Sequence, residues 1–322
     1  MALDPTEARF PAVKKSAGHY ESFYLKACHP TEPLGVWIRY TVHKRPGEET
    51  TGSVWFTLFE AGAGGPVAAK ETMPGPTTGE RDWIRVGGES GIGDGRAFGW
   101  AGSAWWELTF ESPEPPLLHL PTGLMYRAPL PKTKLCSPVP AGAFGGRLGV
   151  GERLIPLDGW RGMVGHNWGS EHAERWIWLH ALTDDGDWLD AAIGKVRMGS
   201  KVTPWVANGA VSIEGERHSL GGLGRSVDVR EEPGRCEFHL TGRGLVVSGD
   251  VSAAIEDCVG WVYADPAGGE HHSLNCSVAD MRLRVEPKER PVRALEIRSG
   301  AAYELGVRET DHGIKIQPFA DG

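Results

Sequence analysis

The stretch Trp176–Val196, WIWLHALTDDGDWLDAAIGKV, contains two extended-looking runs on either side of a turn. In a β-strand, Trp176, Trp178 and His180 point to one face and the residues between them point to the other. Both faces carry bulky side chains, so neither is plainly a solvent face. The segment Asp184-Asp185-Gly186 between the runs is typical of a hairpin turn. The stretch therefore predicts an antiparallel β-hairpin.

The length of the turn decides which side chains meet across this hairpin. A two-residue turn at Asp185-Gly186 would place His180 opposite Ala191. A three-residue loop with Gly186 in the left-handed conformation would place His180 opposite Asp190. In that register Trp178 faces Ala192 and Trp176 faces Gly194, so that large side chains lie opposite small ones and leave space inside a barrel. We favour the three-residue loop, with the side chains of His180 and Asp190 satisfying one another on the cavity face.

The same alternation of apolar and polar residues recurs along the chain, and turn residues separate the runs about every 8–12 residues. Long helical periodicity is nearly absent. The alternating runs lie at 36–43, 54–59, 236–241 and 278–285. We therefore predict an all-β protein. Each half has room for eight to ten short strands, a number that suits a closed antiparallel barrel without exposed sheet edges.

A chain of 322 residues is longer than one core usually supports, so two domains are expected. The stretch 138–158 is rich in Gly and Pro and poor in strand-forming residues. We place the domain boundary there, with one barrel over residues 1–155 and a second over 156–322.

The composition excludes several classes of partner. The net charge is −8 and no run of Lys or Arg occurs, which argues against binding to nucleic acid or to an anionic membrane. No window is apolar enough to form a transmembrane helix, and the N-terminus lacks the apolar core of a signal peptide. The five cysteines are odd in number and lack C-x-x-C spacing, so we expect free thiols and a cytoplasmic location.

Carboxyl groups beside Trp and His are the first candidates for chemistry. Burial raises the pKa of a carboxyl group, which can then deliver a proton. Asp190 and Glu171 are therefore the candidate acids, and His180 is the candidate partner. A His–Asp pair between strands can equally be a structural hydrogen bond.

Thirteen Trp residues are enough to line a cavity as well as to fill a core. Trp168, Trp176 and Trp178 are the candidate walls of a ligand site, since indole faces stabilise a carbocation. His166 and Asn167 lie beside Trp168 in Gly165-His166-Asn167-Trp168-Gly169. They are candidate ligand contacts, or they pin a turn by bonds to the backbone.

Metal and cofactor signals are weak. His166, His172 and His180 lack the spacing of a zinc motif, and the adjacent His271 and His272 would point to opposite faces of a strand. The chain has no Walker A lysine, no G-x-S-x-G elbow and no GxGxxG element. We expect neither a metal nor a cofactor.

Several of these motifs resemble the two-domain lipocalin-like (calycin-like) superfamily. That superfamily includes the carotenoid hydratases (hydroxyneurosporene synthases), tocopherol cyclase and lipocalin-like Diels–Alderases. Glu21–Ala27 and Val36–Thr41 look like its opening strands. Gly165–Gly169, followed by Trp176-Ile177-Trp178 and Asp184–Gly186, is similar to the start of its second barrel.

The resemblance implies two lipocalin-like barrels and, in the enzymatic branches, acid catalysis without a cofactor on prenyl or polyene chains. The hydratases use an aspartate in the strand after the Trp-rich one, and Asp190 best matches it. This chain departs from the hydratases at Gly165, where they carry an aspartate.

Two functions follow from these patterns. The first is hydration, cyclisation or isomerisation of a lipophilic, alkene-bearing small molecule, started by a proton from Asp190 or Glu171. The second is a carrier that binds a hydrophobic small molecule without chemistry. A carrier needs an apolar pocket alone, whereas a catalyst needs a buried titratable group in contact with the ligand. Absence of an enclosed cavity would instead indicate a scaffold or stress protein.

Overall fold

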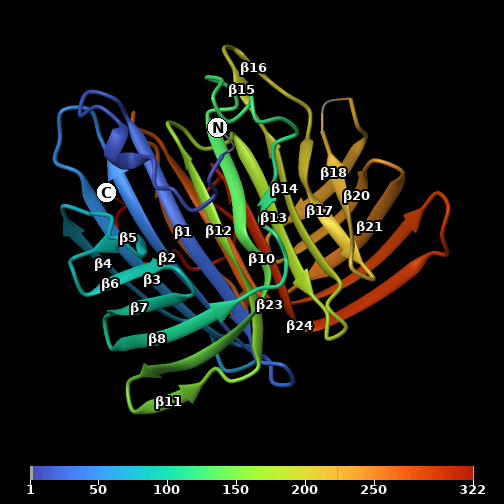
Figure 1. Ribbon diagram of the computed structural model, residues 1–322, viewed down its shortest axis with the longest axis horizontal. Coiled ribbons are helices and arrows are strands. Elements are labelled where there is room, and N and C mark those ends of the chain that lie inside the picture. The colour runs from blue at the N-terminus through green and yellow to red at the C-terminus, as the bar shows by residue number, and fades with distance from the viewer. Residues whose placement is uncertain (1–2, 223, 322) are drawn as a thin grey trace.

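The computed structural model describes residues 3–222 and 224–321, and in these residues strands dominate (Figure 1). The helical elements are two short 3-10 turns, η1 (Phe10–Ala12) and η2 (Ile255–Asp257). None of the described helices has the length and apolar character that crossing a membrane requires. The prediction of an all-β protein with two antiparallel barrel-like sheets is confirmed.

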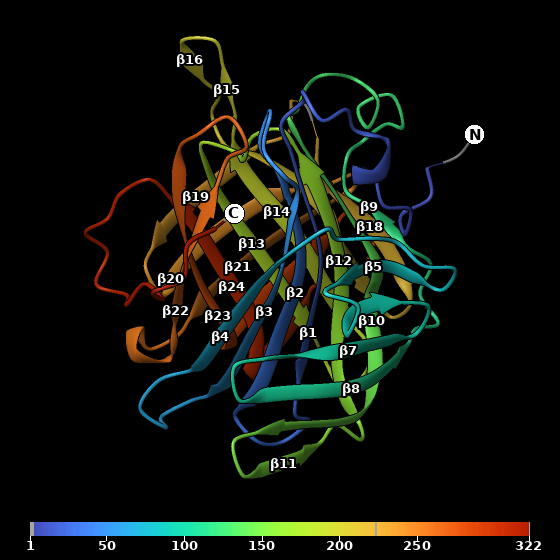
Figure 2. The ribbon, with the colours of Figure 1, turned by 90° about the vertical axis from the view of Figure 1, so that its left-hand side faces the viewer.

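The first sheet is antiparallel and has twelve strands. Its main path runs β4-β3-β2-β1-β12-β10-β8-β7-β6-β5. In Figure 2, β7 and β8 cross the direction of β1 and β2, as the coiled sheet of a barrel requires. The strands are β1 (His19–Cys28), β2 (Leu34–Lys44), β3 (Thr51–Glu60), β4 (Val67–Pro74), β5 (Asp82–Val86), β6 (Ser90–Gly93), β7 (Arg96–Ala101), β8 (Ala104–Glu111), β9 (Leu117–Leu118), β10 (Thr133–Val150), β11 (Arg153–Pro156) and β12 (Trp160–Gly169).

The second sheet has ten strands in the order β18-β17-β14-β13-β24-β23-β21-β20-β19, with β22 paired to β23. A bridge between Leu220 of β18, at one end of this path, and Gly242, directly after β20, brings the two sides together and nearly closes the barrel. The strands are β13 (Arg175–Leu182), β14 (Trp188–Lys195), β17 (Val206–Ile213), β18 (Glu216–Gly221), β19 (Val227–Glu232), β20 (Arg235–Thr241), β21 (Leu245–Ser252), β22 (Val259–Ala264), β23 (Glu270–Pro287) and β24 (Arg293–Val307), and a separate hairpin pairs β15 (Arg197–Met198) with β16 (Lys201–Val202).

The Gly- and Pro-rich stretch 138–158 is not poor in strand, contrary to our expectation, because most of it belongs to the long strand β10. Register shifts around Val139 bend that strand against β12. At Gly146, φ is +95° and an added Cβ would lie 2.2 Å from the Glu107 carbonyl oxygen, so glycine fits a tight crossing here. Residue 155 therefore lies within the first sheet, and the strands change sheet between Gly169 and Arg175.

The structure also places Gly165–Gly169 in a different sheet from the one that the sequence predicted. We expected the motif to open the second barrel. It is the end of β12 in the first sheet, paired on one side with β1 and on the other with β10.

The β13–β14 hairpin has the predicted register. His180 pairs with Asp190, Trp178 with Ala192 and Trp176 with Gly194. The Thr183 N–H donates to the Asp187 carbonyl across the three-residue loop, and Gly186 has a φ of +89°. The left-handed glycine therefore sets the loop length, as the sequence predicted.

The face that carries Trp176, Trp178 and Asp190 does not point into the second barrel, contrary to the prediction. The interior is filled by the alternate residues of the hairpin, Ile177 and Leu179 among them, packed with apolar residues of β20 to β24. The Trp face instead turns toward the first sheet, where the ring of Trp178 contacts that of Tyr24 at 5.4 Å. Because the hairpin is buried on both faces, the sequence alone did not distinguish its interior face.

A second aromatic contact joins the two sheets. Trp37 and Trp55, on the face of β2 and β3 that points away from the first barrel's interior, lie near Trp261 with ring centres 6.4 and 5.1 Å away. All three are essentially buried. The two barrels therefore share an extensive apolar interface, and aromatic pairs of this kind add to the free energy that area burial provides.

Candidate functional site

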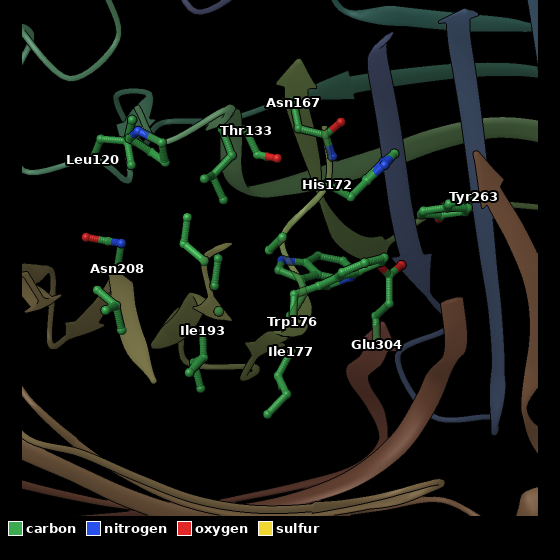
Figure 3. A pocket seen from close by; sticks show the side chains of 18 of the residues that line it. Leu120, Thr133, Asn167, His172, Trp176, Ile177, Ile193, Asn208, Tyr263 and Glu304 are labelled. Atoms are coloured by element: carbon green, nitrogen blue, oxygen red, sulfur yellow. The ribbon is translucent and has the colours of Figure 1, made fainter. Parts of the chain in front are cut away.

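A cavity of about 380 Å³ lies between the two sheets, a size that suits a drug-sized ligand (Figure 3). Each wall comes from a different part of the chain. The first sheet provides residues of β1, β2, β10 and β12, and the second provides residues of β13, β14, β17, β22 and β24. Most of the lining is apolar. The aromatic and aliphatic residues on it include Tyr20, Tyr24, Trp37, Leu120, Met125, Leu130, Leu135, Trp176, Trp178, Ile193, Val196, Met198, Val206 and Tyr263.

His172 is the titratable group best placed at this cavity. Its Nδ1 lies 2.8 Å from Asp265 Oδ1, and its backbone N–H donates to the same oxygen at 2.7 Å. The ring stacks on Tyr20 with centres 4.0 Å apart, which fixes its plane. Its Nε2 is buried and has no hydrogen-bond partner among the described residues. His172 therefore lines the cavity with one ring nitrogen oriented by Asp265 and the other left without a partner among the described residues.

Asp265 holds His172 in one tautomer. Burial alone would raise the pKa of Asp265, but the hydrogen bonds from His172 and the attraction to His172 and His271 together outweigh burial and lower it. The ionised carboxylate accepts the Nδ1 proton, so Nε2 of the neutral ring is an acceptor. This is the arrangement in which a His–Asp pair acts as a general base and, once protonated, as a general acid.

His271 extends the pair into a group of three ligand-type side chains. Its Nδ1 lies 3.8 Å from Asp265 Oδ2, and the donor atoms of His172, Asp265 and His271 all lie within 4.8 Å of one another. Burial and the nearby His172 lower the pKa of His271 to about 4, so its ring is neutral at neutral pH. Such a set could hold zinc. A metal bound through Nδ1 of His172 would have to replace its hydrogen bond to Asp265.

Glu304 is the carboxylate on the cavity wall. It accepts a hydrogen bond from Trp176 Nε1 at 2.8 Å and another from the Asn275 amide at 3.1 Å. These bonds fix the indole of Trp176, which stacks near His172 with ring centres 5.6 Å apart. In Figure 3, Trp176, Glu304 and His172 gather on the side of Tyr263, and Leu120 lies on the opposite side.

Asp190 lies behind the wall rather than on it. It is fully buried and accepts hydrogen bonds from Ser137 Oγ at 2.5 Å and from Trp178 Nε1 at 3.1 Å. Burial alone would raise its pKa, but attraction and hydrogen bonding to His119, 3.3 Å away, lower it to about 2. The raised pKa that we expected is therefore wrong. Asp190 is ionised at neutral pH and holds the cavity-lining indole of Trp178 in place.

The side chain of His180 bonds the backbone of β10 rather than Asp190. His180 pairs with Asp190 in register, but its Nε2 is 2.9 Å from the Pro140 carbonyl, so the two side chains do not satisfy one another as expected. Burial and the charge of Lys26 lower the pKa of His180 to about 4. The residue joins β13 to β10 as a neutral ring.

Of the remaining predicted residues, one lines the cavity and three do not. Asn167 lines the cavity and accepts a bond from Ser22. His166 points away from it and bonds Glu21 at 2.8 Å, and Trp168 packs beside Tyr126. Glu171 is partly exposed and pairs with Lys132. Of the predicted candidates, the structure brings Asn167, Trp176 and Trp178 together on the cavity wall.

The packing of Tyr24 explains why residue 165 is a glycine. A Cβ added there would lie 2.2 Å from Tyr24 Cζ, because the phenol ring lies directly over the glycine. An aspartate at this position has no room. Tyr24 occupies the space and presents its ring to the cavity instead.

Two glycines flank Trp176 and allow a matched test of how its position is fixed. Trp176 pairs with Gly306 on β24 and with Gly194 on β14. A Cβ at Gly306 would lie 2.0 Å from the indole, whereas a Cβ at Gly194 would meet nothing closer than 3.6 Å. We expect Gly306→Ala to lower the free energy of unfolding by about 1–3 kcal/mol through overpacking. Gly194→Ala should change it little, as measured by urea unfolding. Equal effects of both substitutions would contradict this account of the Trp176 position.

The sequence patterns did not identify His172, Asp265, Glu304 or Arg39 as residues of the site, and His172 entered only as a weak candidate for a metal ligand. A signal was present for Arg39, which alternates with Val36 and Ile38 and shares its face with Trp37, indicating a covered second face of that strand. The His172–Asp265 pair spans 93 residues and no short motif marks it.

Comparison with known proteins gives relatives of low sequence identity. No protein-family model matches the chain. The sequence is 28% identical over 285 residues to an uncharacterised protein of Mycobacterium tuberculosis, found in strains CDC 1551 and H37Rv, with 86% of this chain and 84% of the relative covered.

Solved structures show the fold. The chain is similar to a candidate AttH protein from Nitrosomonas europaea, with TM-score 0.56 and 13% identity over 95% of this chain and 99% of that one. It is similar to CghA, solved with Sch210972, with TM-score 0.61 and 9% identity over 90% and 88%. It is also similar to kievitone hydratase from Nectria haematococca, with TM-score 0.52 and 12% identity over 95% and 93%. The two-barrel lipocalin-like fold that the sequence motifs implied is confirmed.

Proposed function

We propose that this protein is an enzyme that moves a proton on a lipophilic, alkene-bearing small molecule held between its two barrels, without a cofactor. The reaction class is isomerisation, hydration or cyclisation of a conjugated alkene such as an isoprenoid or polyene. One observation carries the proposal: His172 lines a mostly apolar cavity, and its ring, oriented by Asp265, keeps one buried nitrogen without a hydrogen-bond partner among the described residues.

The proton balance is simple. In isomerisation, Nε2 of neutral His172 takes a proton from an allylic carbon and returns it to the far end of the conjugated system. In hydration, the imidazolium gives its proton to the alkene, water adds to the resulting cation, and the surplus proton returns to Nε2. In hydration, the face of Trp176, with the carboxylate of Glu304 nearby, would stabilise the carbocation.

This proposal moves the acid–base role from Asp190 and Glu171 to His172. Asp190 remains important by holding Trp178, and Glu171 lies outside the cavity lining. The hydratase among the similar structures supports the reaction class, because its fold is shared. The five cysteines are free and buried, which supports the cytoplasmic location that we propose.

The apolar cavity also favours a carrier without chemistry, and one experiment separates the two functions. Purified protein is incubated in deuterium oxide with a lipid extract of the organism that makes it, and the extract is analysed by mass spectrometry. An enzyme is expected to add deuterium, or the elements of deuterium oxide, to at least one compound. His172→Gln should abolish this label, since the amide keeps the volume but cannot relay a proton.

His239→Gln, on the exposed face of β20, is the matched control and should keep full labelling. Native mass spectrometry of the same samples shows whether a lipid is bound. A bound lipid with no label in the wild type would establish the carrier instead. Equal labelling by wild type and His172→Gln would remove His172 from the mechanism.

A further inference from the structure

Arg39 is a buried cation on the cavity wall. It lies on β2 between Tyr24 and Trp55 of the neighbouring strands, and only 4% of it is exposed. Its guanidinium carbon lies 4.0 Å from the ring centre of Tyr263 and 5.6 Å from that of Trp55. The guanidinium is therefore held by aromatic faces at the Tyr263 side of the cavity.

Among the described residues, no carboxylate lies within ion-pair distance of this guanidinium. Within residues 3–222 and 224–321, Arg39 forms no ion pair, and its Nε and Nη1 are buried without a hydrogen-bond partner. The neighbouring cation Lys70 makes the contrast clear. Lys70 also lies over Trp55, at 3.8 Å, but it pairs with Asp321 at 3.2 Å. The carboxylate on the cavity wall, Glu304, is bonded to Trp176 and Asn275.

A buried, unpaired guanidinium is costly unless something completes its hydrogen bonds. Its planar fork of N–H donors matches a carboxylate, which it binds through two parallel bonds. We propose that Arg39 receives the carboxylate of a lipophilic carboxylic acid. The apolar body of that acid extends past Trp176 and Trp178 toward the Leu120 side of the cavity, opposite Tyr263 (Figure 3).

This assignment rests on the proposed function only in using the same cavity, and it names the substrate class. An acid anchored at Arg39 places its chain beside His172, because both residues lie close to the Tyr263 ring, His172 with a ring separation of 5.7 Å. Arg39 sets the position of the substrate, and His172 does the chemistry.

The test compares two probes that differ in one charge. cis-Parinaric acid is a fluorescent polyene acid, and its methyl ester lacks the anionic group. Titration followed by energy transfer from tryptophan gives the Kd of each. We expect wild type to bind the acid about ten- to hundredfold more tightly than the ester, the range for hydrogen bonds to a charged group. Arg39→Gln should remove this preference, and Arg39→Lys should keep part of it.

Arg298→Gln, on an exposed side chain of β24, is the matched control and should keep the full preference. His172→Gln should also keep it while losing deuterium transfer, so failure of the anchor and failure of the chemistry give different results. Equal affinity of wild type for acid and ester would overturn the assignment, and this comparison needs no variant. A preference that survives in folded Arg39→Gln, or failure of both probes to bind, would overturn it as well.

Discussion

Replacing Glu21 with alanine is expected to lower the free energy of unfolding by about 3–5 kcal/mol, because the substitution leaves several buried donors without an acceptor. Glu21 is fully buried. Its carboxylate accepts the backbone N–H groups of Arg9 and Phe10 at 2.8 and 2.6 Å, and it lies 2.8 Å from His166 Nε2 and 3.2 Å from His19 Nε2. It therefore ties the N-terminal segment and the end of β12 to β1. Urea unfolding at neutral pH measures the loss.

The role of the Glu21 carboxylate can also be tested through the pH dependence of stability. Burial alone would raise the pKa of Glu21, but the hydrogen bonds from His166 and His19 lower it from 4.5 to about 2. The contribution of Glu21 is therefore fully present above pH 4.5 and is lost as the pH falls toward 2, a change of about 3 kcal/mol. Glu21→Gln should flatten this fall. The exposed Glu296→Gln is the control, and an unchanged pH profile in Glu21→Gln would contradict the assignment.

Replacing Asp265 with asparagine is expected to lower kcat about 10²–10⁴-fold and to leave the Kd for parinaric acid nearly unchanged. The carboxylate accepts the Nδ1 proton of His172 and leaves Nε2 free to accept one. An asparagine amide can donate to Nδ1 instead, which moves the ring proton to Nε2 and gives the wrong tautomer. Steady-state turnover of the compound that gains deuterium measures the effect.

Asp250→Asn provides the control, since Asp250 pairs with Arg282 on the surface of the second barrel. The control should keep full turnover. If Asp265→Asn stays within a fewfold of wild type, while its fold and its ligand affinity are intact, Asp265 does not orient the catalytic base. Loss of ligand affinity in Asp265→Asn would instead assign it to binding.

The sequence predicts local features of this fold well, because near neighbours determine them. Alternation of side chains identified the strands, and the need for a left-handed residue at Gly186 gave the correct pairing of His180 with Asp190. The aromatic residues Trp176 and Trp178 were assigned to the cavity wall for the same reason. They alternate with the core residue Ile177, and small residues face them across the hairpin.

The face and the partners of a strand depend on residues far away in the chain. Trp178 and Leu179 are both buried, so burial alone could not show which of them points into the barrel. The low pKa of Asp190 arises from His119, which a loop and the first sheet bring beside it. The glycines of β10 resemble those of a linker in the sequence. In the structure they allow one long strand to bend, and this role depends on its pairing with β8 and β12.

Because the cavity lies between the two sheets, ligand binding is linked to the stability of the whole chain. Neither half can hold a ligand in this cavity alone, because Tyr24 and Thr133 come from one sheet and Trp176 and Val206 from the other. The binding free energy of the ligand therefore adds to the contact between the halves, and it appears as a rise in melting temperature with ligand concentration. Because a bound ligand contacts both barrels, we expect the occupied protein to unfold as one cooperative unit.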